Sequence, residues 1–155
     1  MNIAGQNVKR DVVIEIGKFA ILWNHFEHFH CNNHCDPSRI KEIANFIVIS
    51  EDKMNLLREA LKNRMDISEE DTHVYVYKGL YPTGSIDTKK EENKQYMERF
   101  INNDSDQMNN TIGCLLIIQR IRNNMMHGLK DISELSGQLE LFQAVNGVLE
   151  NITEH

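Results

Sequence analysis

The chain has 155 residues, of which 17 are Lys or Arg and 23 are Asp or Glu, and its net charge is −6. This length suits one substantial core, so we expect a single domain spanning residues 1–155. The net negative charge argues against a protein that coats nucleic acid by bulk electrostatics. The apolar runs are too short to span a membrane, so no membrane is expected as a partner. The missing secretory signal and three irregularly spaced cysteines favour free thiols and a cytoplasmic location.

Apolar residues in the first half recur at helical spacing. The first predicted helix covers about residues 8–34, and its inward stripe is Val12, Ile16, Phe19, Trp23, Phe26 and His30. A second helix is expected to begin at Pro37, and a third carries Met54, Leu57, Leu61 and Met65. The segment 66–93 has no such stripe, so we interpret it as a long insertion or loop between helices.

The second half predicts two further helices. Asp104 with Gln107 fits a capping box, and the helix that follows is expected to run to His127 and close at Gly128. A last helix starts near Ser133. The sum is an all-α, up-and-down bundle of about five helices.

The stretch from Arg120 to Gly128 ends the apolar part of its helix with groups that can act on a phosphodiester. An Arg fork binds phosphate oxygens, and His exchanges a proton near neutral pH. At 100° per residue, one arc of about 140° contains Gln119, Arg122, Asn123, Met126 and His127. Arg120, Arg122 and Lys130 also form a small local basic patch in an acidic chain.

Two segments resemble the HEPN superfamily. Arg122-Asn123-Asn124-Met125-Met126-His127, followed by Gly128, resembles its signature of Arg, a polar residue, a short spacer and His at a helix end. Trp23-Asn-His-Phe-Glu27 in the first helix resembles the "W-x-x-F-E" pattern of prokaryotic members. Residues 50–105 match nothing in that family.

The resemblance implies a homodimeric helical bundle in which the two motifs face each other. It implies a metal-independent endoribonuclease without a cofactor, working as a toxin with an antitoxin partner or in antiviral (phage) defence. RNA would be cut by its own 2′-hydroxyl, leaving a 2′,3′-cyclic phosphate. DNA would not be a substrate, because it lacks the 2′-hydroxyl. By position, His127 would be the general acid or base, Arg122 would stabilise the phosphorane, and Asn123 would orient the phosphate or the histidine. Supporting polar residues would be Glu27, Gln119, Arg120 and Asn124.

Two alternatives remain open. The same groove could belong to a non-catalytic HEPN-like module that binds RNA, nucleotide or a partner protein. The first helix could instead be a metal sensor through His30 with His34 and Cys31 with Cys35, each four residues apart. Those pairs point about 100° apart, and apart from His73 no second ligand group is evident, so we favour a polar helix surface with buried thiols.

Overall fold

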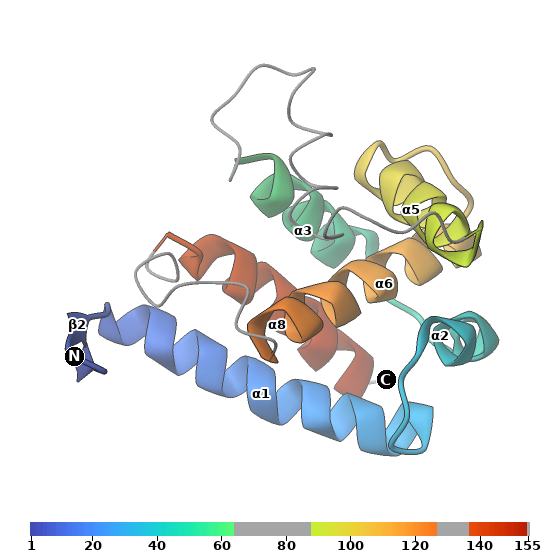
Figure 1. Ribbon diagram of the computed structural model, residues 1–155. Coiled ribbons are helices and arrows are strands. Elements are labelled where there is room, and N and C mark those ends of the chain that lie inside the picture. Colours follow the sequence, from blue (N-terminus) through green and yellow to red (C-terminus); the bar gives the residue numbers. More distant parts are fainter. Residues whose placement is uncertain (64–87, 127–136, 155) are drawn as a thin grey trace.

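The computed structural model describes residues 1–63, 88–126 and 137–154 (Figure 1). Within these ranges the chain forms six α-helices, one 3-10 helix and one small antiparallel hairpin. The elements are β1 (Asn2–Ile3), β2 (Gln6–Asn7), α1 (Arg10–Cys31), α2 (Pro37–Ile43), η1 (Ala44–Phe46), α3 (Glu51–Asn63), α5 (Thr88–Ile101), α6 (Gln107–Met126) and α8 (Leu139–Thr153). The predicted all-α bundle is therefore confirmed.

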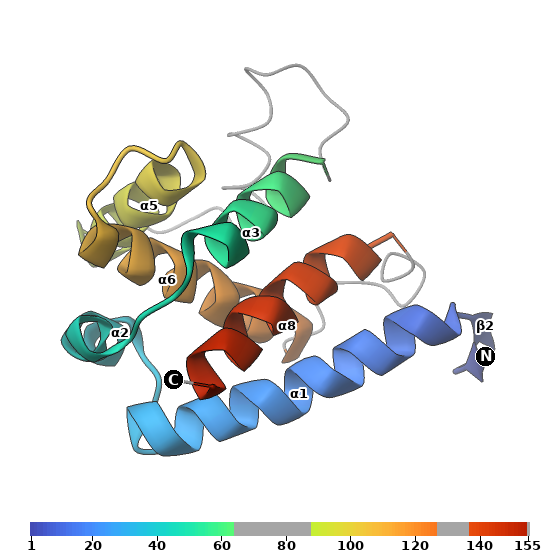
Figure 2. The same cartoon turned by 180° about the vertical axis from the view of Figure 1, so that it is seen from behind.

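Helix α6 runs through the middle of the bundle. In both views α1 and α8 lie side by side and run in the same direction, while α6 runs the opposite way (Figures 1 and 2). Since α5, α2 and η1 pack against α6, it is buried on every side from Asn110 to Ile118. None of the described helices is both long and apolar enough to cross a bilayer.

Helix α1 buries most of the stripe that its spacing predicts. Val12, Phe19, Trp23 and Phe26 are buried, Ile16 and His30 are half-buried, and this face packs against α8. The helix ends at Cys31, three residues before the predicted end, because Asn32 takes the left-handed conformation with φ 53°.

Helix α5 corrects the interpretation of residues 66–93 as an insertion. Residues 88–93 are helical, whereas 64–87 lie outside the described part of the chain. Met97, Phe100 and Ile101 at the end of α5 are buried and hold the helix against α6. The last helix is described from Leu139, so its expected start near Ser133 also falls outside that part.

The cap of α6 differs from the predicted one. The Asp106 carboxylate accepts a hydrogen bond from the backbone N–H of Asn109 at 2.8 Å, and the helix begins at Gln107. Asp106 is therefore the N-cap residue in place of Asp104, because only Asp106 directly precedes the first turn.

Helices α5 and α6 approach each other most closely at Gly113. A Cβ atom at this position would lie 2.7 Å from the Cβ of Phe100 and would also meet the backbone of Tyr96. We expect Gly113→Ala to lower the free energy of unfolding by about 1–3 kcal/mol, because the backbone must shift. Thermal denaturation measures this. Gly147→Ala is the control: its Cβ would meet the flexible Lys53 side chain at ordinary contact distances, 3.7 Å from Cδ and 3.9 Å from Nζ, so stability should be unchanged or slightly higher. Equal melting temperatures for both variants would contradict this packing.

Candidate functional site

A cavity of about 430 Å³ lies between α1 and the C-terminal end of α6. In both views this end of α6 lies close to the middle of α1 (Figures 1 and 2). We call it the α1–α6 cavity, and its lining residues are Phe19, Ala20, Ile21, Trp23, Asn24, Glu27, Arg122 and Met125. Glu27 and Arg122, which the resemblance names from two distant segments, therefore line one cavity.

The α1–α6 cavity has apolar walls. Phe19 and Trp23 are buried, and Met125 is half-buried and packs against the core. Trp23 is held against the Phe26 ring, with centroids 5.4 Å apart. The buried Trp23 Nε1–H finds no acceptor among residues 1–63, 88–126 and 137–154. Such walls suit a flat, partly apolar ligand group.

The polar lining consists of Asn24, which is exposed, and Glu27 and Arg122, which are half-buried. Arg122 Nη1 donates to Asn123 Oδ1 at 3.1 Å. No hydrogen bond or ion pair joins the Glu27 carboxylate to any described residue, Arg122 included. A carboxylate acceptor and most donors of a guanidinium are therefore available to a ligand in the same cavity.

The other polar residues of α6 that the resemblance names lie outside the α1–α6 cavity lining. Gln119 Nε2 donates to the carbonyl oxygen of Cys35, which ties α6 to the segment before α2. Asn124 is buried, at 4% exposure, and Arg120 is half-buried, and neither lines the cavity. In the described structure Gln119 thus serves packing between helices. His127, together with Gly128 and Lys130, lies outside the described residues.

The cysteines of the first helix differ from the prediction. Cys31 and Cys35 form a disulfide, with Cα atoms 4.9 Å apart, so the prediction of free thiols is wrong for these two. Cys114 is a free, fully buried thiol, and burial raises its pKa to about 12. It is therefore an unreactive core residue.

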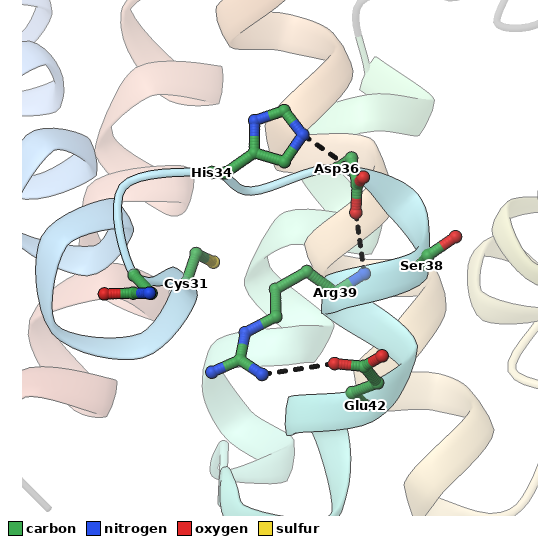
Figure 3. Close-up of a pocket in the computed structure, with 7 residues that line it drawn as sticks. Cys31, His34, Asp36, Ser38, Arg39 and Glu42 are labelled. Atoms are coloured by element: carbon green, nitrogen blue, oxygen red, sulfur yellow. Dashed lines mark hydrogen bonds and ion pairs between the residues drawn. The ribbon is translucent and has the colours of Figure 1, made fainter.

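A second cavity, of about 350 Å³, lies beside this disulfide, and Figure 3 shows its side chains. It is lined by Cys31, Asn32, His34, Asp36, Ser38, Arg39 and Glu42. Its polar side chains pair with one another: His34 Nε2 lies 3.3 Å from Asp36 Oδ2, and Arg39 Nη1 donates to Glu42 at 3.1 Å. In the described ranges no three His, Cys, Asp or Glu side chains are grouped to hold a metal ion.

The histidines of α1 are engaged locally. His28 Nδ1 lies 3.0 Å from Asn33 Oδ1. Burial, and secondly the charge of His25, lower the pKa of His30. The described surroundings of these histidines give the metal-sensor alternative no support.

Sequence reasoning named Glu27 but missed Ala20 and Asn24 as lining residues of the α1–α6 cavity. Ala20 and Asn24 are four residues apart and Glu27 follows three residues later, which places all three on one face beside the buried stripe of α1. This spacing was the sequence signal that could have identified the missed lining residues. Which part of α6 this face meets depends on how the helices cross, and local spacing does not determine that.

Comparison of the chain with protein-family models, curated proteins and solved structures gave no match.

Proposed function

We propose that this protein is a cytoplasmic, metal-independent endoribonuclease of the HEPN type. One observation supports the proposal above all. Glu27 of α1 and Arg122 of α6 belong to the two segments that resemble the superfamily, and both line the α1–α6 cavity. An RNA-cleaving site without a metal needs a cation that can stabilise charge on the phosphate, and Arg122 has donors available for this task.

Each motif residue has a chemical task in this reaction. The RNA 2′-oxygen attacks the adjacent phosphorus, the bond from phosphorus to the 5′-oxygen breaks, and a 2′,3′-cyclic phosphate remains. Arg122 binds the non-bridging oxygens and stabilises the charge of the phosphorane. Asn123 accepts from Arg122 Nη1 and so orients the guanidinium. His127, which follows the last residue of α6 in sequence, accepts the 2′-hydroxyl proton or donates one to the leaving oxygen.

The proposal includes a homodimer with the two motifs facing each other across a shared RNA groove. It also includes a toxin or phage-defence role with an antitoxin or activating partner. With a net charge of −6, the protein would attract RNA only through a narrow cationic strip. Such a strip favours selected substrates over bulk RNA.

The test is incubation of a mixed RNA pool with the purified protein in EDTA, alongside His127→Ala. We expect fragments ending in 2′,3′-cyclic phosphate from the natural protein, and intact RNA with the variant, because the proton-transfer group is lost. Equal fragmentation by both proteins would rule out His127 as the acid or base.

The second candidate function is a non-catalytic module that binds a nucleotide in the same cavity. The available Glu27 and Arg122 side chains beside apolar walls favour binding whether or not cleavage occurs. Toxicity on expression that His127→Ala relieves would favour the enzyme. Binding of nucleotide without toxicity or cleavage would favour the module.

A further inference from the structure

The α1–α6 cavity has apolar walls and a carboxylate that a phosphate-binding site does not need. Arg122 supplies a cation for a phosphate, yet the cavity extends over Phe19, Trp23 and Met125 and includes the Glu27 carboxylate. Its volume of about 430 Å³ falls within the range of roughly 300–1,000 Å³ for small-molecule pockets. Apolar and aromatic walls with a few polar groups are typical of sites that hold a nucleobase.

We propose that the α1–α6 cavity binds a guanine base of the RNA, with Glu27 reading its Watson–Crick edge and Arg122 holding the attached phosphate. This inference rests on the proposed function, because it takes RNA as the ligand. It goes further by naming the base that the cavity selects.

The choice of guanine follows from hydrogen-bonding chemistry. An ionised carboxylate only accepts hydrogen bonds, and it has two oxygens side by side. Guanine presents two adjacent donors, N1–H and the exocyclic N2–H, which match those oxygens. Adenine and cytosine place a ring acceptor beside their amino group, and uracil flanks its single N–H with two carbonyls. Each of these three bases would therefore place an acceptor lone pair opposite a carboxylate oxygen, and the two would repel each other.

The remaining lining is consistent with this orientation. Because the Glu27 carboxylate has no hydrogen-bond or ion-pair partner in the described part of the chain, no such bond to a described residue must break when a base binds. Exposed Asn24, one turn before Glu27 on α1, carries an amide that can donate to a guanine acceptor, O6 or N7. Trp23 and Met125 form apolar walls suited to the face of the ring.

The test measures binding of the four nucleoside 3′-monophosphates to the full chain in EDTA, by calorimetry or NMR titration. We expect the guanosine nucleotide to bind at least about tenfold more tightly than the other three. Inosine 3′-monophosphate, which lacks the N2 amino group, should lose most of this advantage. Equal affinities for all four, or no binding at all, would overturn the proposal.

Glu27→Gln tests the residue itself. We expect this variant to lose about tenfold in affinity for the guanosine nucleotide and to bind the other three as before, because the amide replaces one acceptor with a donor. Glu59→Gln on the exposed face of α3 is the matched control and should change nothing. Guanosine preference that survives in Glu27→Gln would overturn the assignment.

Failure of this inference and failure of the proposed function can be told apart, because binding does not require cleavage. Selective guanosine binding without RNA cleavage would keep the base site and refute the ribonuclease. Cleavage without any base preference would keep the ribonuclease and refute the base site.

Discussion

Arg122→Ala is expected to slow RNA cleavage by about a hundredfold to a thousandfold while leaving the fold intact. The guanidinium is half-buried in the α1–α6 cavity, and its only described hydrogen-bond partner is the adjacent Asn123. Removing it should cost little stability but should remove donors that stabilise charge in the transition state. The measurement is the single-turnover cleavage rate with protein in excess, together with the melting temperature.

Two variants accompany this experiment. Arg99→Ala removes the same charge from an exposed position on α5 and should cleave at the full rate. Arg122→Lys keeps the charge but loses the two-pronged donor geometry, so its rate should lie near that of Arg122→Ala. A full rate for Arg122→Ala would contradict the catalytic assignment.

Arg58→Ala is expected to cause the largest loss of stability, about 3 kcal/mol. Arg58 is buried, at 4% exposure, and its Nε donates to the Phe100 carbonyl at 2.7 Å. Its Nη1 donates to Glu51 at 2.8 Å, and its guanidinium lies 4.4 Å from the centre of the Phe100 ring. Truncation would therefore remove the hydrogen bonds and the ring contact that join α3 to the end of α5, and the Phe100 carbonyl would keep only the backbone N–H of Asn103, at 3.1 Å, as a donor.

Thermal denaturation measures this effect. For a chain of this size, 1 kcal/mol corresponds to about 2–4 °C, so we expect the melting temperature to fall by about 10 °C. Arg39→Ala is the control, because its pair with Glu42 is partly exposed and should contribute less than about 1 kcal/mol. If the Arg58→Ala and Arg39→Ala variants had the same melting temperature, the buried hydrogen bonds of Arg58 would have no net stabilising role.

Helices whose burial shows in local spacing were predicted well. The stripes of α1 and α3 follow from residues three and four apart, and the structure buries most of their described members. Helix α5 escaped prediction because its first turns are polar, and only Met97, Phe100 and Ile101 point to a buried face. The disulfide escaped because helical spacing was extended past Cys31, whereas Asn32 ends the helix and Cys35 comes back beside Cys31.

The candidate site was predicted in part. Helical periodicity alone separates Arg122 and Asn123 from the fully buried face of α6. It could not show that Gln119, on the same arc, bonds to the Cys35 carbonyl, because that partner comes from another part of the chain. The shared cavity of Glu27 and Arg122 likewise depends on tertiary packing. The position of His127 stays a prediction.

Attack by the RNA 2′-hydroxyl can be tested with one pair of matched substrates. An RNA oligonucleotide that the protein cuts at one bond is compared, in EDTA, with the same oligonucleotide carrying a single 2′-deoxynucleotide on the 5′ side of that bond. We predict a 2′,3′-cyclic phosphate product from the first and no cleavage at that bond in the second, because the nucleophile is missing. Cleavage of both at equal rates would show that water attacks the phosphate, and would contradict the proposed mechanism.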